Sequence, residues 1–461
     1  MSPNRRRALG ALVALALVMG PLALAQAPGL SLSDALAALP QSPSWQKADL
    51  DYQSAVDALA AARAGAGLRV SAAGSYDRTD TLAGPAGRNG SSAKVSVSAS
   101  ATVLPWAPTD ASITNAQAAL QVAALTRDSA RSTLVITMEQ QYFAARLAAR
   151  ARDVAQAALQ QAQAKLSAAQ AQHAQGQLSD QGLAQAQAAV ASAQASLTQA
   201  TGTLDLDRRT LFDTLGLPLS DATLTTAAPS ASAPGSTLAQ LVQSGVPKRD
   251  DVQTAQVRVR QAQDSLSATT TQRWIPAASL NVGVTGSDST GSQAGLGVSA
   301  DLDFQKGTLS GTASYPVAPA PVGNVSTQLS IGASVSIPLD APSSDAAIRS
   351  GRTALASAKA ALAATERSAE LDIRQRYASY QAAQASLAAD QASEATAKAA
   401  LDTARARLTA GLAARLDVGD AQLAYRQAQR TVEADQNALY LALLQLRNAL
   451  GELNATPGGT P

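Results

Sequence analysis

Residues 94–104 alternate strictly between apolar and polar side chains, and this alternation predicts a β-strand. Val95 and Val97 point to one face of that strand, with Ser96 and Ser98 on the other. The same alternation recurs, in part more weakly, at residues 68–76, 280–284 and 329–337. We therefore predict four clear strands in two strand regions, about 67–104 and about 277–338.

The two faces of these strands differ in a way that suits a membrane β-barrel. One face is apolar and uncharged, and the other is small and polar, as the wall of a water-filled barrel requires. Strands of about 9–11 residues are also long enough for a tilted membrane crossing. A soluble β-sandwich, in which each sheet has one solvent-exposed face, would show the same alternation, so that alternative stays open. Four strands cannot close a barrel, so closure would require several chains.

Helical patterns fill most of the remaining chain, and Ala, the best helix former, supplies much of its apolar content. Each strand region is preceded by a short amphipathic helix and followed by a very long helix, a glycine turn and another helix. The expected helices are about 48–65 and 248–271, about 108–173 and 341–409, and about 179–215 and 416–450. A helix of about 65 residues would be about 100 Å long at 1.5 Å per residue. That length predicts a coiled-coil-like assembly rather than one compact globule.

The order of these elements indicates an internal duplication. A shift of 235 positions matches residues 110–216 to residues 345–451 without a gap. The matching pairs include Gly176 with Gly411, Gly216 with Gly451, and Tyr142 with Tyr377. A fixed spacing across so many positions is the signature of a repeated structural unit.

The duplication predicts the organisation of the chain. The first repeat is expected at residues 28–226 and the second at residues 237–453, joined by a low-complexity linker, 227–236, and followed by a flexible tail, 454–461. The second repeat carries about 30 extra residues near its strands, and we place them at 291–324. This insert is rich in Gly, Ser, Thr and Pro, and we expect an enlarged outside loop, with or without a hairpin of its own.

The N-terminus has the pattern of a secretory signal peptide, residues 1–25. Arg5 to Arg7 precede an apolar run, 8–24, and small residues place cleavage after Ala25 or Ala27. That run is short for a spanning helix, which needs about 20 residues, although an uncleaved anchor is the alternative. No later segment is long and apolar enough to span as a helix, so the mature chain would enter a membrane as a barrel.

Charge and reactive residues exclude several classes of function. The chain has 36 basic and 34 acidic side chains, and loss of three signal arginines leaves it close to neutral, so we expect no nucleic-acid partner. It has no Cys, and its single His173 lies beside a polar turn, so we expect no metal site and no cofactor. No nucleophile–base set or phosphate loop is present, and we do not expect an enzyme.

Several short motifs give the chain a resemblance to the outer-membrane efflux protein family, the TolC-like channels, over nearly all of its mature length. These motifs are Leu32–Leu36, Gln141–Tyr142, Ile337–Leu339, Arg376–Tyr377, Gly411–Gln422 and Leu450–Leu453. Each one is weak alone, but their order, their duplication and the signal peptide together make the resemblance specific.

The resemblance implies a mixed α/β membrane protein that works as a homotrimer in the cell outer membrane. Each protomer of that family gives four strands to a twelve-stranded β-barrel in outer-membrane lipid, and its helices form a long periplasmic tunnel. The implied partners are a periplasmic adaptor protein and an inner-membrane transporter. The implied function is that of a passive exit duct in a tripartite efflux pump or a type I secretion system.

The glycine turns at Gly176 and Gly411 join the antiparallel helices of each repeat. In the resembled family such turns form the periplasmic tips where the adaptor docks. A glycine that only ends a helix in the left-handed conformation would give the same signal, and both interpretations can hold together.

Two carboxylates, Asp417 and Asp420, follow the second turn and lie three residues apart, so they share one helix face. The resemblance implies that they line the tunnel constriction, where three chains would form a ring of six carboxylates that controls selectivity and gating. Helix capping by an Asp in a first turn is the alternative. Arg415 is a candidate partner for a salt-bridge lock between the helix pairs.

Prolines mark the joints between strands and helices, with Pro105 in the first repeat and Pro338 in the second. Trp106 and Trp274 lie beside such joints, either as anchors at the membrane interface or as ordinary packing residues.

Two rival functions remain open from the sequence. A structural coiled-coil spacer or tether of the cell envelope would use the same helices and barrel without carrying any flow. A soluble periplasmic adaptor also has long helices, but the duplicated helix pairs and the barrel-type strands count against it.

Overall fold

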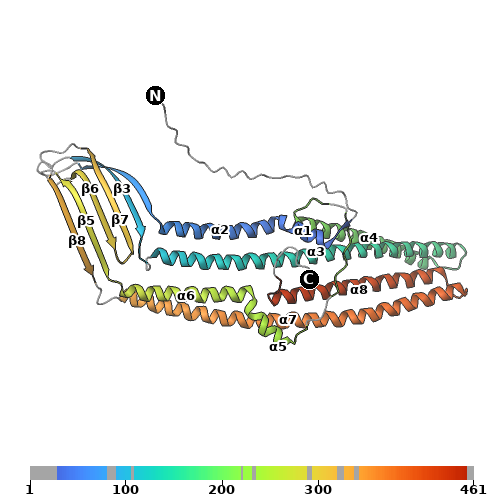
Figure 1. Ribbon diagram of the computed structural model, residues 1–461. Coiled ribbons are helices and arrows are strands. Elements are labelled where there is room, and N and C mark those ends of the chain that lie inside the picture. Colours follow the sequence, from blue (N-terminus) through green and yellow to red (C-terminus); the bar gives the residue numbers. More distant parts are fainter. Residues whose placement is uncertain are drawn as a thin grey trace, which may run out of the picture.

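The structure is a computed structural model in which a curved β-sheet and a bundle of long helices lie end to end (Figure 1). It describes residues 29–79, 90–104, 108–219, 222–230, 235–287, 293–318, 326–336 and 342–453. The expected signal peptide and C-terminal tail lie outside these residues, and so do the predicted joint residues Pro105, Pro338 and Trp106.

Two helices run the whole length of the bundle, α3 (Pro108–Ala174) and α7 (Pro342–Thr409). With 67 and 68 residues, each is about 100 Å long at 1.5 Å per residue. Shorter helices accompany each long one, one beside the half near the sheet and one beside the far half (Figure 1). These are α2 (Pro43–Ala66) and α4 (Asp180–Leu215) with α3, and α6 (Asp250–Trp274) and α8 (Arg415–Ala449) with α7.

The helix bounds confirm the internal duplication. A shift of 235 carries both ends of α3 to within one residue of the ends of α7, and α4 matches α8 equally well. Four glycines that end helices have positive φ, between 66° and 74°, a conformation that side-chain-bearing residues rarely adopt. They are Gly176, Gly216, Gly411 and Gly451, the two glycine pairs found in the sequence.

A small mixed region surrounds the middle of the helices and holds the main apolar cores. In the first repeat it contains the parallel pair β1 (Gly29–Leu30) and β4 (Thr223–Leu224), with α1 (Leu32–Ala38) and the 3₁₀ helix η1 (Leu39–Gln41). In the second repeat it contains α5 (Leu238–Gly245) and the 3₁₀ helix η2 (Val246–Lys248).

Tyr142 of α3 ties this region together. Its side chain is fully buried, and its hydroxyl donates to the Leu30 carbonyl at 2.8 Å and accepts from the Thr226 amide at 3.0 Å. Phe143 packs edge-on against Tyr142 and against Tyr440 of α8, each with 5.6 Å between ring centroids. The core therefore joins the first repeat to the second.

One antiparallel sheet forms the other end of the molecule, with strand order β2-β3-β7-β6-β5-β8. Its strands are β2 (Arg69–Thr79), β3 (Gly90–Thr102), β5 (Ala277–Ser287), β6 (Gln293–Asp303), β7 (Thr308–Ala318) and β8 (Ser326–Ser336). The prediction of long helices with a sheet is confirmed, but the prediction of four strands is wrong. The described sheet has six, because residues 293–318 of the insert form β6 and β7, the hairpin that the sequence left open beside a loop, and both strands join the sheet. Its small polar residues, which we interpreted as loop composition, form the polar face of these strands.

The apolar face of the sheet is exposed in a single protomer. Large apolar side chains on every strand lie open on this face, and they include Val70, Val97, Val284, Val298, Leu309 and Ile331. Within the described residues, the helices include none with the length and hydropathy needed to cross a membrane.

Candidate functional site

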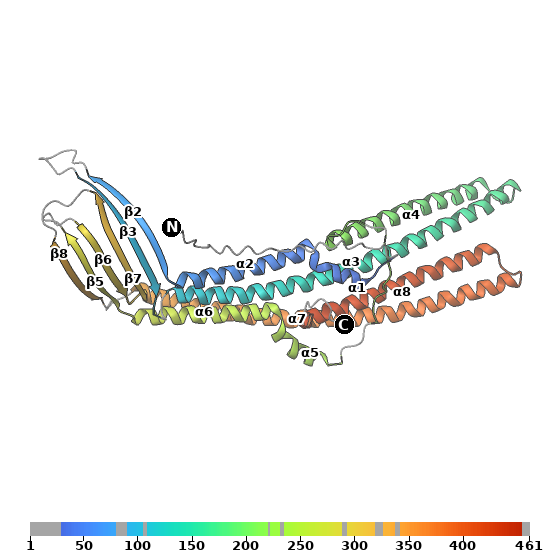
Figure 2. The ribbon, with the colours of Figure 1, turned by 45° about the horizontal axis from the view of Figure 1, so that its top comes forward.

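The two helical hairpins, α3 with α4 and α7 with α8, meet along the facing helices α3 and α8 (Figure 2). We call this contact the inter-hairpin seam and define it by Arg146, Arg150, Gln161 and Lys165 of α3 with Asp420 and Glu433 of α8. Polar and charged side chains bridge the two helices at two levels, one near the turns and one closer to the middle of the molecule.

The bridge nearer the turns is centred on Asp420. Lys165 places its Nζ 2.7 Å from the Asp420 carboxylate, and Gln161 donates through Nε2 to the same carboxylate at 3.0 Å. Gln161 also donates to the Leu416 carbonyl at 2.8 Å. A Cβ at Gly419 would come within 2.2 Å of the Gln161 side chain, so glycine allows this close approach.

The second bridge is a more buried ion pair. Arg146 and Glu433 lie 2.5 Å apart, and their side chains are only 14% and 19% exposed. Arg150 adds a longer contact of 3.4 Å with the same carboxylate. Because one hairpin supplies the arginines and the other supplies the carboxylate, separating α3 from α8 would break this charge pair.

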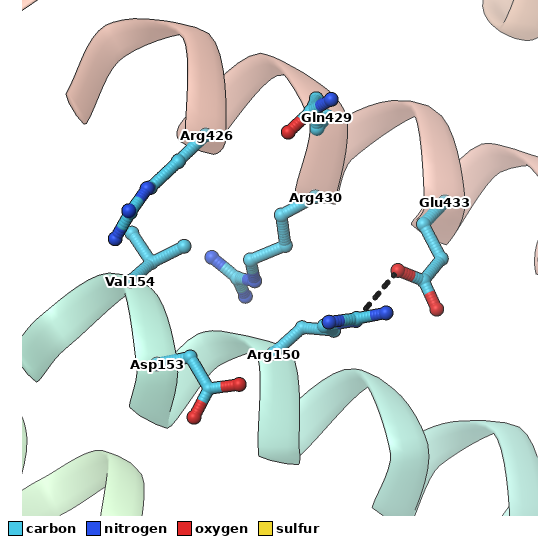
Figure 3. Close-up of a pocket in the computed structure, with 7 residues that line it drawn as sticks. All are labelled: Arg150, Asp153, Val154, Arg426, Gln429, Arg430 and Glu433. Atoms are coloured by element: carbon cyan, nitrogen blue, oxygen red, sulfur yellow. Dashed lines mark ion pairs between the residues drawn. The ribbon is translucent and has the colours of Figure 1, made fainter. Parts of the chain in front are cut away.

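A cleft of about 450 Å³ opens beside the second bridge (Figure 3). Its lining comes from α3 and α8 and consists of Arg150, Asp153, Val154, Arg426, Gln429, Arg430 and Glu433. Three arginines therefore face two carboxylates, and the ion pair between Arg150 and Glu433 crosses the cleft. The cleft at this level is lined mainly by charged side chains, with one more arginine than carboxylate, rather than by apolar ones.

The two predicted ring carboxylates have different surroundings. Asp417 accepts a hydrogen bond from the Ala414 amide at 2.9 Å, which caps the first turn of α8. Asp420 instead reaches across the seam to Lys165. Arg415, the candidate lock partner, is exposed at the start of α8, and the ion pair described for Asp420 is with Lys165.

Sequence reasoning missed the α3 side of the seam, although a signal was present. Arg146 and Arg150 are four residues apart, and so are Gln161 and Lys165, so each pair lies on one helix face. Glu433 was missed because no local pattern shows which face of α8 meets the other hairpin.

Both predicted tip turns are exposed and have the same hydrogen bonding. Gln177 donates to the Gln172 carbonyl at 2.9 Å, and Leu412 donates to the Arg407 carbonyl at 2.8 Å, with Gly176 or Gly411 between them. This pattern ends a helix on a left-handed glycine.

Trp274 ends α6 next to the sheet and is 78% exposed. Its ring contacts the Arg273 guanidinium, 5.7 Å from the ring centroid. An exposed Trp beside the sheet is placed as an interface anchor would be, and its exposure argues against core packing within one chain. Among the described residues, His and acidic side chains form no cluster that could hold a metal ion.

Solved outer-membrane channels share this fold. The outer membrane protein VceC of Vibrio cholerae has a TM-score of 0.63 at 20% identity and covers 91% of this chain and 96% of its own. The CmeC outer membrane channel of Campylobacter jejuni has a TM-score of 0.68 at 14% identity, and the match covers 91% of this chain and 85% of CmeC. The open-state MtrE outer membrane channel of Neisseria gonorrhoeae has a TM-score of 0.66 at 17% identity, and the match covers 93% of this chain and 90% of MtrE.

The sequence itself carries the family assignment. No curated protein sequence matches the chain significantly. The sequence pattern of the outer membrane efflux protein family, however, matches residues 36–217 and 241–452, which is most of the chain. Members of this family are transport ducts of the outer membrane, with a long periplasmic helical portion and no catalytic activity. The chain belongs to the outer membrane efflux protein family and is an outer-membrane efflux duct rather than an enzyme.

Proposed function

We propose that three copies of this chain form a passive exit duct that an inner-membrane transporter feeds through a periplasmic adaptor, in a tripartite efflux pump or a type I secretion system. One observation carries the proposal: the same protomer has a sheet with one apolar and one polar face at one end of helices of about 100 Å. The sheet suits the wall of a lipid-embedded pore, and the helices suit the wall of a tunnel across the periplasm.

The inter-hairpin seam is the gate of this duct. The tunnel can widen at its tips only if neighbouring hairpins move apart, and the bridges from Lys165 and Gln161 to Asp420 oppose that movement within each protomer. In a trimer, Asp417 and Asp420 would contribute six carboxylates near the narrow end. Such a ring attracts cations, and its mutual repulsion favours opening once the bridges are released.

The tips themselves are the adaptor-docking sites. The turns at Gly176 and Gly411 are exposed, and Leu412, next to the second turn, is 72% exposed. An apolar side chain at the far end of a polar helix pair is a suitable contact for a partner protein. The pairing of two related tips in each chain would offer the adaptor two similar but unequal surfaces.

Ion conductance across a planar lipid bilayer tests this function. Purified protein should produce small, cation-selective current steps, because the closed aperture is narrow and acidic. The Asp417→Ala/Asp420→Ala variant should give larger steps with weaker cation selectivity. Absence of current from folded, bilayer-inserted protein would refute the duct and favour an envelope tether.

A further inference from the structure

The hairpin formed by β6 and β7 lies inside the sheet rather than at its edge. β7 pairs with β3, the last strand that the first repeat gives to this sheet, and β6 pairs with β5, the first strand of the second repeat. The hairpin therefore separates the two repeats and widens the sheet of one protomer from four strands to six. This differs from the four strands per chain that the family resemblance implies.

The turn of this hairpin is bonded to its neighbours on both sides. On the β3 side, the Gly307 carbonyl accepts hydrogen bonds from Val103 at 2.8 Å and Leu104 at 3.2 Å. On the β5 side, Phe304 donates to the Ala278 carbonyl at 2.9 Å. A hairpin that only projected from the sheet as a loop would lack these lateral bonds, so the turn closes a continuous wall.

Inside the turn, Gly307 has a φ of 64°, and the Asp303 carboxylate accepts from the Lys306 amide at 2.9 Å. These are the features of a short hairpin turn with a left-handed glycine. The connection has no helix attached to it, unlike the other strand ends on that side of the sheet.

Both faces of the sheet continue across the inserted strands. One row of cross-strand neighbours is apolar throughout, namely Ala72, Val97, Ala313, Val298, Val284 and Leu329. The adjacent row is small and mostly polar, namely Ser71, Ser98, Thr312, Ser299, Gly283 and Ser330. The insert therefore obeys the same division into an apolar and a polar face as the strands on either side of it.

The sheet leaves β2 and β8 as its two open edges. With six antiparallel strands, an even number, β2 and β8 run in opposite directions, and both have 11 residues. The β8 edge of one chain can therefore pair with the β2 edge of the next chain and continue the antiparallel alternation.

From this continuous wall and its matching edges we infer that three chains close an eighteen-stranded barrel, rather than one of twelve strands. This inference rests on the trimer of the proposed function. For strands about 4.8 Å apart and tilted by about 40°, the backbone radius rises from about 12 Å to about 18 Å. The cross-section within the backbone is then about 2.2 times larger, and eighteen strands are enough to leave an aqueous channel. The outlet can accept molecules wider than a twelve-stranded barrel would pass.

Disulfide cross-linking tests the position of the hairpin, because the chain has no cysteine of its own. Ser98 and Thr312 are direct partners on the polar face, so the Ser98→Cys/Thr312→Cys variant should cross-link within one chain. The matched variant Ser98→Cys/Asn281→Cys joins β3 to β5, which the hairpin holds apart, and it should not cross-link. If the Ser98–Asn281 link forms and the Ser98–Thr312 link does not, β3 pairs with β5 directly and the inference is overturned.

The edge contact is tested separately by placing Ser75→Cys on β2 and, in turn, Ser330→Cys, Gly332→Cys or Ser334→Cys on β8. One of these three pairs should link chains into covalent dimers and trimers, since together they cover register shifts of about 4 to 8 residues per chain, as the tilt of the strands requires. If the Ser98–Thr312 link forms but all three edge pairs stay monomeric, the trimer of the proposed function fails while the six-stranded wall stands. Covalent trimers together with a Ser98–Asn281 link would keep the trimer and refute the eighteen-stranded barrel.

Discussion

Replacing Lys165 by methionine should favour the open state of the duct. Lys165→Met keeps most of the side-chain stem but removes the charge that lies 2.7 Å from the Asp420 carboxylate. Both side chains are about half exposed, 49% and 48%, so water screens their attraction. An ion pair of this kind contributes about 0.2–1 kcal/mol.

The effect is multiplied by the number of chains. If all three seams must open together and act independently, the closed state loses about 0.6–3 kcal/mol, which raises the open-to-closed ratio by about 3-fold to about 160-fold. Asp420 keeps its hydrogen bond from Gln161, so the tips should remain folded. The gain should also shrink at high salt, because salt screens the pair in the wild-type protein.

Open probability in planar bilayers, measured at low and high salt, provides the assay. Lys47→Met is the matched control, because it removes a similar exposed ion pair with Asp51 at 2.6 Å on α2, outside the seam. An unchanged open probability for Lys165→Met at low salt would refute the gate at this seam. An equal rise for both variants would show that the effect is not specific to the seam.

Three further variants test the seam and the core through the melting temperature in detergent. Glu433→Gln should lower the free energy of unfolding by about 2 kcal/mol and the melting temperature with it. The reason is that Arg146 and Arg150 each lose a charge-assisted contact at a mostly buried position. Tyr142→Phe should cost about 1–3 kcal/mol, because it leaves two backbone groups near the core without their hydroxyl partner. Burial raises the pKa of the Glu139 carboxyl, although a hydrogen bond with Tyr440 opposes the shift. A raised pKa means that ionisation of Glu139 weakens the fold as pH rises through that pKa, so Glu139→Gln should melt higher than wild type at pH 7. The difference in melting temperature should disappear below the ordinary pKa of a glutamate, where Glu139 is protonated in both the folded and the unfolded chain. A difference that grows in acid would show that ionisation of Glu139 stabilises the fold, and it would contradict this prediction.

The long helices could be predicted from the sequence because their signals are local. Alanine-rich stretches favour helix, and a glycine that must adopt positive φ ends each one, as at Gly176 and Gly411. The same glycines, spaced by 235 positions, revealed the duplication that the helix bounds then confirmed. Strand alternation was equally local where valines marked one face, as in β3.

The inserted strands and the seam were harder to predict, for different reasons. In β6 and β7, serine, threonine and glycine fill the polar face, and composition alone cannot separate such a face from a loop. The partner of Asp420 depends on how the two hairpins are rotated about their axes, which follows from packing over the whole bundle. Lys165 lies 255 residues from Asp420 in the chain, so only the tertiary structure brings them together.

Electron cryo-microscopy of the purified protein in lipid nanodiscs tests the central claim most directly. We expect three chains around a single lumen that runs unobstructed from the extracellular end of the strands to the acidic narrowing at the helical tips. A single chain in the lipid, or an interior filled with protein at the strand end, would contradict an efflux duct.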